Sequence, residues 1–297
     1  MSTILVTGGA GFIGSNFIRS LRNQRVINVD KLTYAAQVRK GVIKADIANK
    51  SQIEAIFKKY KPDYLVNFAA ETHVDRSVHG NTDVFVQTNV KGVHVLLEAC
   101  RKYGIKKYVQ VSTDEVYGDV EVNSKKTFTE AAKLSPSSPY SSTKAAGDLL
   151  CLSYHRSFGV PVVVTRGSNT YGPYQYPEKL IPFFVKRMLA GKTMPLYGDG
   201  KNTRDWLFVE DHCRGIELVL KKGKPGEIYN ISAEEYHTNI DLARRIGGKI
   251  EFVTDRPGHD RKYAPDSSKI RKQLGWKPKA KFDEALKETI EWYKKNL

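Results

Sequence analysis

The sequence predicts an α/β fold, a Rossmann-type doubly wound parallel sheet with a smaller, discontinuous C-terminal substrate-binding region. Two observations lead to this prediction. Apolar runs rich in β-branched residues alternate with helical patterns through the first half of the chain, and a glycine-rich turn follows the first run. Parallel strands covered by helices on both faces are typically continuous apolar runs, so the alternation indicates such a sheet.

The strands are predicted at the segments TILVTG, RVINVD, DYLVNFA, KYVQVS and VPVVVTRG. Helical patterns lie between them, at SQIEAIFKKY, VKGVHVLLEACRKYG and SSTKAAGDLLCLSYHRSFG. After about Gly167 the pattern loosens, because Pro and Gly interrupt it, and residues 203–222 are predicted to form a strand and a helix that return to the first domain. We therefore predict one domain of residues 1–167 and 203–222, and a second of 168–202 and 223–297.

Composition restricts the class of protein. The 297 residues carry a net charge of +16, which is consistent with an anionic partner such as a phosphorylated small molecule or a nucleic acid. The basic residues are scattered, however, which favours solvated faces over a nucleic-acid surface. Three cysteines without metal-like spacing indicate reduced thiols and a cytoplasmic protein, and no leader or membrane span is expected. No cluster of His, Asp and Glu has metal spacing, so we predict no metal.

The glycine-rich turn predicts a dinucleotide site. Gly8, Gly11 and Gly14 stand between the first strand and a helix, where the backbone approaches a pyrophosphate closely. Asp30 ends the second strand, where a carboxylate accepts hydrogen bonds from both ribose hydroxyls and repels the 2′-phosphate of NADP. The pattern therefore favours NAD. The alternative is a turn that uses glycine for packing alone.

Two further pairs of residues suggest chemistry. Tyr140 and Lys144 are four residues apart on one face of a helix that starts after Pro139, and a lysine beside a tyrosine favours the phenolate. Asp114 and Glu115 are adjacent, directly after a buried strand. They form either a solvated turn or an acid and a base whose pKa values are separated by their surroundings.

Together, Gly8-x-x-Gly11-x-x-Gly14 and Tyr140-x-x-x-Lys144 resemble the extended short-chain dehydrogenase/reductases that act on nucleotide sugars. Within that group, the chain is most similar to the nucleotide-sugar 4,6-dehydratases that use dTDP-glucose. The resemblance covers nearly the whole chain, through the segments DKLTYA, NFAAETHVDRS, STDEVYGD, SNTYGPYQYPEKLIP, LYGDGKNTRDWLFVEDH and VTDRPGHDRKYAPD. It departs from the family's usual pattern in a short segment after DKLTYA and in Thr170, where a second Asn is usual.

The resemblance implies an NAD-dependent lyase that removes water from dTDP-glucose. Tyr140 would deprotonate the sugar 4-hydroxyl as hydride passes from C4 to NAD, and Thr113 would hydrogen-bond the same oxygen. Glu115 would take the proton from C5, and Asp114 would protonate the departing 6-hydroxyl before hydride returns to C6. Lys144 completes the implied catalytic set.

The resemblance also implies the binding residues. For NAD these are Gly8, Gly11, Phe12, Ile13, Gly14, Asp30, Lys31, Thr33, Asp46, Ile47, Phe68, Ala69, Ala70, Thr88, Tyr140 and Lys144. For the nucleotide sugar they are Glu71, Thr72, Thr113, Asn169, Glu178, Lys179, Pro195, Tyr197, Arg204, Asn239, Arg256 and His259. The first domain would then bind NAD and the second the nucleotide sugar. His73, His79 and His212 are interpreted as ordinary polar or core residues.

Three other functions stay open at this point. A 4,6-dehydratase for UDP-glucose differs in one methyl group of the base, and a UDP-sugar 4-epimerase shares Tyr140 and Lys144 but leaves Asp114 and Glu115 unexplained. A non-catalytic dinucleotide-binding protein that holds RNA requires a contiguous basic face. The resemblance implies a small-molecule substrate with no nucleic acid or membrane, and a homodimer through a four-helix bundle.

Overall fold

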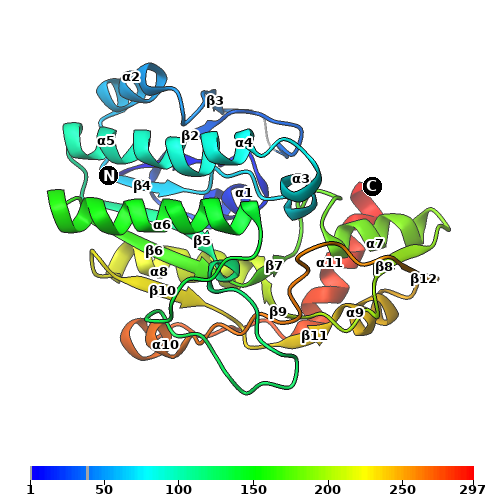
Figure 1. The fold of residues 1–297 in the computed structure, drawn as a ribbon. Coiled ribbons are helices and arrows are strands. Elements are labelled where there is room, and N and C mark those ends of the chain that lie inside the picture. The colour runs from blue at the N-terminus through cyan, green and yellow to red at the C-terminus, as the bar shows by residue number, and fades with distance from the viewer. Residues whose placement is uncertain (1, 38–39) are drawn as a thin grey trace.

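The computed structural model describes residues 2–37 and 40–297, and its centre is a sheet of seven parallel strands (Figure 1). The strand order is β10-β6-β5-β4-β1-β2-β3, so the chain winds outward in both directions from its middle. These strands are β1 (Thr3–Thr7), β2 (Arg25–Asp30), β3 (Ile43–Lys44), β4 (Tyr64–Asn67), β5 (Lys107–Thr113), β6 (Val162–Gly167) and β10 (Ile228–Ile231). The predicted α/β fold with a doubly wound parallel sheet is confirmed.

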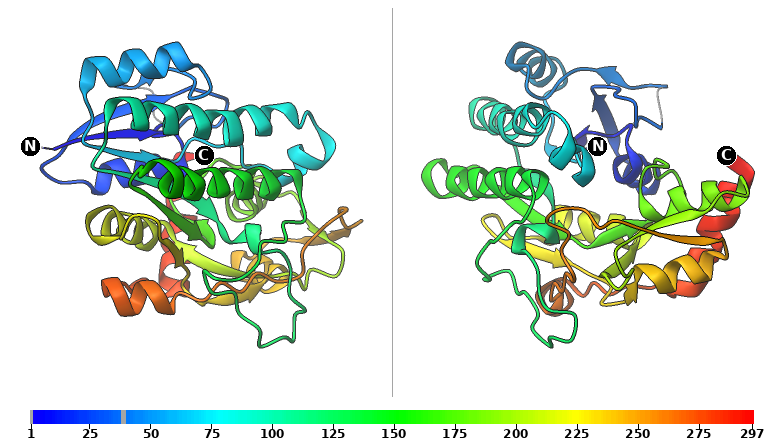
Figure 2. Two further views of the ribbon diagram at one scale, coloured as in Figure 1. Left: turned by 60° about the vertical axis from the view of Figure 1, so that its left-hand side comes forward. Right: turned by 45° about the vertical axis from the view of Figure 1, so that its right-hand side comes forward.

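Helices cover both faces of this sheet. One layer contains α2 (Lys50–Tyr60), α5 (Val93–Tyr103) and α6 (Pro139–Phe158), which run side by side (Figures 1 and 2). The opposite layer contains α1 (Phe12–Ser20) and α8 (Val209–Lys222), which pack against each other. Along β1, Ile4 and Val6 belong to one apolar core and Leu5 to the other. Both faces of the strand are therefore buried, as its continuous apolar run predicts.

Short elements surround the edge of this layered body. The helical segments α3 (Val74–His79), α4 (Asp83–Phe85) and η1 (Val86–Gly92) lead into α5. A single turn of 3₁₀-helix, η2 (Asp114–Tyr117), follows β5 directly. Gly118 ends this turn at φ +83°, and a Cβ there would lie 2.2 Å from the Ser135 carbonyl oxygen. Glycine therefore determines where the chain leaves the turn that carries the two adjacent acids.

A smaller region lies beyond the carboxyl ends of the strands. It contains a three-stranded sheet, β11-β9-β7, and a two-stranded sheet, β12-β8. Its strands are β7 (Asn169–Tyr171), β8 (Met194–Tyr197), β9 (Thr203–Phe208), β11 (Tyr236–Thr238) and β12 (Ile250–Val253). Its helices are α7 (Leu180–Leu189), α9 (Asn239–Ile246) and α11 (Phe282–Asn296), whereas α10 (Ser268–Leu274) packs against β10 and α8 of the large-sheet body. Figure 2 shows this region as a separate layer beside the large sheet.

The return of the chain to the large sheet differs from the prediction. Within 203–222, only α8 covers the large sheet, because β9 pairs with β7 and β11 instead. The strand that does return is β10, which pairs in parallel with β6 and lies in the stretch assigned to the second domain. All six residues of β9 are buried, as in a large-sheet strand, although Thr203, Arg204 and Asp205 are polar. Within the described residues, no helix has the length and apolar character of a membrane span.

Candidate active site

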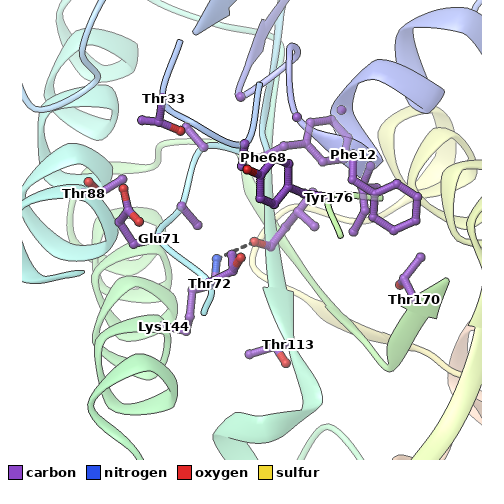
Figure 3. Close-up of a pocket in the computed structure, with 18 of the residues that line it drawn as sticks. Phe12, Thr33, Phe68, Glu71, Thr72, Thr88, Thr113, Lys144, Thr170 and Tyr176 are labelled. Carbon is purple, nitrogen blue, oxygen red and sulfur yellow. Dashed lines mark hydrogen bonds between the residues drawn. The ribbon is translucent and has the colours of Figure 1, made fainter. Parts of the chain in front are cut away.

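A deep cavity opens where the carboxyl ends of β1, β2, β4, β5 and β6 face the smaller region (Figure 3). This is the edge at which doubly wound sheets bind ligands, because the strand order reverses there. Figure 3 shows Phe12 on the α1 side and Lys144 on the α6 side, with Thr113 at the end of β5 between them. The residues predicted to bind NAD and the residues predicted to be catalytic therefore share one cavity.

The glycine turn brings the backbone close to the cavity. Gly8 has φ +72°, and a Cβ there would lie 2.4 Å from the Ala69 backbone nitrogen. A Cβ on Gly14 would lie 2.3 Å from the Gly8 carbonyl oxygen. The space beside both residues admits no side chain, so β1, β4 and the start of α1 meet through backbone alone. The free N–H groups at the start of α1 then face the cavity and suit a pyrophosphate.

Asp30 lies at the end of β2 on the rim of the same cavity. Its two carboxylate oxygens accept hydrogen bonds from the Ala10 N–H at 3.0 Å and the Leu32 N–H at 2.7 Å. A carboxylate offers about four acceptor positions, so Asp30 can still accept ribose hydroxyls. Nearby, Lys31 Nζ lies 2.8 Å from Asp46. Burial works against ionisation of Asp46, but hydrogen bonds from Lys31 and the Ala48 N–H lower its pKa. These residues fit the adenosine half of NAD.

The helix that carries Tyr140 has a well-defined start. Ser138 caps α6 by accepting a hydrogen bond from the Ser141 N–H, and the Ser138 N–H donates in turn to the Ser141 hydroxyl oxygen, which completes a capping box. Pro139 occupies the first turn, where its missing N–H costs nothing. Tyr140 and Lys144 are then buried on the face that turns toward β5, and Lys144 Nζ donates to the Val111 carbonyl oxygen at 2.7 Å.

The pKa of Tyr140 differs from the sequence-based expectation. Burial is the main cause that raises this pKa well above its ordinary value, and the charges of Glu115 and Asp114 add to the effect. A hydrogen bond with Thr113 works in the opposite direction. Burial also lowers the pKa of Lys144, whose ammonium group binds the Val111 carbonyl rather than the phenol. In this structure, therefore, Lys144 alone does not make Tyr140 acidic.

The two adjacent acids are not a solvated turn. Asp114 is 2% exposed, and its Oδ2 has no hydrogen-bond partner among the described residues. Burial, followed by the charge of Glu115, raises the pKa of Asp114 well above its usual value. Burial also raises the pKa of Glu115, but the positive charges of Arg204, Lys179 and Arg256 oppose this. The surroundings thus favour a protonated Asp114 beside a more readily ionised Glu115.

All of the residues predicted to bind NAD line this cavity. Of the predicted substrate residues, six also line it, namely Glu71, Thr72, Thr113, Asn169, Glu178 and Lys179. The other six are not part of its lining, namely Pro195, Tyr197, Arg204, Asn239, Arg256 and His259. The structure thus brings all of the predicted NAD residues into one cavity, together with half of the predicted substrate residues.

Residues outside the cavity lining are engaged with one another. Arg256 forms an ion pair with Asp75, which also accepts a hydrogen bond from Tyr197 at 3.4 Å. His259 Nδ1 lies 2.6 Å from Asp255, and the His259 ring packs edge-on against Tyr197. Arg204 donates to the Asp260 carbonyl oxygen at 2.9 Å. Tyr197, Arg256 and His259 thus form a polar cluster beyond the acids, and Arg204 acts on Glu115 through its charge.

Some lining residues were absent from the predicted set. Tyr34 donates to Glu178 at 2.9 Å and lies under the guanidinium of Arg76, so it connects the rim of the NAD half to the smaller region. His212 also lines the cavity, where its Nδ1 lies 2.7 Å from Thr170 Oγ1. The segments DKLTYA and SNTYGPYQYPEKLIP contain Tyr34 and Thr170, but no spacing within them indicates these contacts.

Comparisons with known proteins agree on one family. Residues 5–289 match the family model described as GDP-mannose 4,6 dehydratase. The dTDP-glucose 4,6-dehydratase of Xanthomonas campestris is 44% identical over 333 aligned positions, covering 100% of this chain and 94% of that protein. The crystal structure of the Bacillus anthracis dTDP-glucose 4,6-dehydratase in complex with NAD is 46% identical, with a TM-score of 0.90, covering 100% and 97% of the two chains.

An epimerase has the same overall shape. The Thermus thermophilus UDP-glucose 4-epimerase, crystallised with NAD, has a TM-score of 0.93 over 99% of this chain and 100% of its own. Its sequence identity is 30%, clearly lower than that of the two dehydratases. Backbone shape alone therefore does not separate the two activities, and the side chains of the cavity must decide.

Proposed function

This chain belongs to the nucleotide-sugar 4,6-dehydratase family, and we propose that it removes water from dTDP-glucose to give dTDP-4-keto-6-deoxyglucose. It is an NAD-dependent lyase. The observation that carries the proposal is the pair of buried Asp114 and half-buried Glu115, with pKa values that their surroundings separate, beside Tyr140. Elimination of water needs an acid and a base that act on neighbouring carbons of one sugar.

We assign the first step to Tyr140, Thr113 and Lys144. NAD, when bound, accepts a hydride from C4 and later returns it to C6. Tyr140 takes the proton of the 4-hydroxyl, and Thr113 hydrogen-bonds the same oxygen. The contact with the Val111 carbonyl holds the Lys144 ammonium at the floor of the cavity, where its positive charge favours the phenolate of Tyr140, the form that accepts this proton.

The elimination is assigned to the two acids. A ketone at C4 makes the C5 proton acidic, and Glu115 removes it while Asp114 protonates the departing 6-hydroxyl, which leaves as water. When hydride adds to C6, Glu115 returns a proton to C5, and the proton that Tyr140 gained offsets the proton that Asp114 gave. Burial favours the protonated form of Asp114, whereas Arg204, Lys179 and Arg256 favour the ionised form of Glu115.

The nucleotide is proposed to lie between the cavity and the polar cluster of Tyr197, Arg256 and His259. A guanidinium matches two phosphate oxygens, so Arg204 and Arg256 suit the diphosphate. Asn169, Glu178, Lys179 and Asn239 would surround the nucleotide, Glu71 and Thr72 the sugar, and Pro195 and Tyr197 the thymine. Arg256 would exchange its present ion pair with Asp75 for the substrate.

A homodimer in the cytoplasm completes the proposal. Val86 on η1 and Leu149 and Phe158 on α6 expose apolar side chains at 48%, 57% and 48% of their surfaces. They lie on the layer of helices that covers one face of the sheet, where a second copy would complete a four-helix bundle. Light scattering tests this arrangement, and a particle of about 33.5 kDa would exclude it.

The test of the reaction is incubation with dTDP-glucose in deuterated water, with UDP-glucose in parallel. We expect a product that has lost one water and carries deuterium at C5, formed preferentially from dTDP-glucose. An unchanged mass with an inverted 4-position would establish the epimerase instead. Equal rates with both nucleotides would remove the preference for thymine.

A further inference from the structure

A buried ion pair lies beneath the active site and takes no part in the assigned chemistry. Arg166 Nε on β6 donates to Asp148 Oδ2 on α6 at 2.9 Å, and the two side chains are 2% and 0% exposed. Asp148 Oδ1 and Arg166 Nη1 have no hydrogen-bond partner among the described residues. A pair with such incomplete hydrogen bonding is weak evidence for a role in stability, because desolvation opposes the attraction.

One end of this pair lies on the helix of the proton-transfer tyrosine. Tyr140, Lys144 and Asp148 follow one another at intervals of four residues in α6 and therefore share a face of the helix. The charge of Asp148 favours the ammonium form of Lys144, whose Nζ is fixed on the Val111 carbonyl oxygen. Asp148 thus continues the row of catalytic side chains by one helical turn.

The other end reaches the turn that carries the two acids. The guanidinium of Arg166 lies over the ring of Tyr117, 4.8 Å from its centre. Tyr117 is the last residue of η2, the same turn that contains Asp114 and Glu115. An arginine over an aromatic face is attracted by the negative ring face, most strongly away from water. Arg166 therefore contacts both α6 and η2.

Tyr117 is itself fixed from the opposite side. Its hydroxyl donates to Asn230 Oδ1 on β10 at 2.7 Å, and its ring stacks on Phe128 with 5.3 Å between centres. Asn230 in turn donates to the Phe128 carbonyl oxygen at 2.9 Å. The ring cannot follow a small movement of Arg166 without breaking these contacts. The connection from α6 to η2 is accordingly rigid at both ends.

We propose that Asp148, Arg166 and Tyr117 are positioning residues that hold the Tyr140–Lys144 pair at a fixed distance from the Asp114–Glu115 pair. This inference rests on the proposed function, in which one bound sugar must meet both pairs. The oxidation at C4 needs only the first pair, whereas the elimination across C5 and C6 needs the second pair in register with it. Loss of the connection should therefore impair elimination more than oxidation.

The test uses two variants of the full protein with its cofactor. The double variant Asp148→Asn with Arg166→Gln replaces the ion pair without leaving a lone buried charge, and Tyr117→Leu removes the aromatic face without a change of charge. In a single turnover with dTDP-glucose, the reduced cofactor is followed by its absorbance and water loss by product mass. We expect elimination to fall on the order of 10²-fold relative to cofactor reduction, as for a displacement of about 1 Å.

Arg214→Met is the matched control. Arg214 forms an ion pair with the buried Asp211 and donates to the Lys277 carbonyl oxygen at 2.9 Å, so its loss weakens the fold without touching α6 or η2. We expect a lower melting temperature and an unchanged ratio of elimination to reduction. If the positioning variants also keep that ratio, or slow both steps equally, the inference is wrong. If the unaltered protein reduces the cofactor but forms no dehydrated product, the proposed function fails first.

Discussion

The two halves of the site are built differently. In the NAD half, the large sheet and the starts of its helices bring backbone to the cavity, and Gly8 and Gly14 admit no side chain there. In the nucleotide half, long side chains such as Arg204 and Arg256 come from loops and short strands and form other contacts in this structure. A ligand in the first half meets a site already formed, whereas the role proposed for Arg256 requires its ion pair with Asp75 to rearrange.

This difference explains where each half tolerates change. Gly8 and Gly14 allow no substitution that adds a Cβ. An arginine on a loop can be replaced with the loss of its own contacts only. The acids Asp114 and Glu115 lie where the halves meet, at the end of a large-sheet strand but among the charges of the smaller region. Changes at this junction should have the largest effect.

Glu115→Gln should have the largest effect on elimination. The amide keeps the shape of the side chain but cannot accept the C5 proton, so dehydration should fall by about 10²–10⁴-fold. Product mass in deuterated water measures the loss, and absorbance of the reduced cofactor shows whether C4 oxidation survives. Turnover close to that of the unaltered protein would mean that Glu115 is not the base.

Gly8→Ala tests the preformed half. The new Cβ would lie 2.4 Å from the Ala69 nitrogen, and the residue keeps φ +72°. We expect loss of bound NAD, measured as cofactor content of the purified protein. Gly275→Ala is the matched control, since Gly275 has φ +72° in the left-handed region and nothing lies within 4 Å of its added Cβ. That variant should lose about 1–2 kcal/mol of stability and retain NAD. Equal NAD content in both variants would contradict the argument.

The residues predicted to bind NAD lie together in one cavity for the same physical reason. Glycine spacing, Asp30 after β2 and the Tyr140–Lys144 interval are local patterns that a regular strand or helix converts directly into geometry. All of the residues predicted for that half line the cavity. The contacts of Tyr34 with Glu178 and of His212 with Thr170 join segments far apart in the chain. No local pattern specifies such pairs, and the same is true of β9, which pairs outside the large sheet.

Arg256→Lys sharpens the comparison on the nucleotide side. A lysine keeps the charge but lacks the fork that matches two phosphate oxygens. We expect KM for dTDP-glucose to rise about tenfold with kcat nearly unchanged, the signature of lost uniform binding. Steady-state kinetics measures both constants. A large fall in kcat with KM unchanged would place Arg256 in the chemistry instead of in binding.

His212, which lines the cavity where the two halves meet, is expected to affect the stability of the fold and not the reaction itself. Burial lowers its pKa to about 4 from the ordinary 6.5, so between these pH values the unfolded chain binds a proton that the folded chain does not. The free energy of unfolding contributed by His212 therefore rises with pH from about 4 to 6.5 and is constant above, amounting to roughly 3 kcal/mol. Denaturant unfolding at several pH values measures it. In His212→Gln this part of the slope should vanish, because the amide does not titrate, while Thr170 keeps a neutral partner. An identical slope in both proteins would show that the imidazole titrates as it does in water.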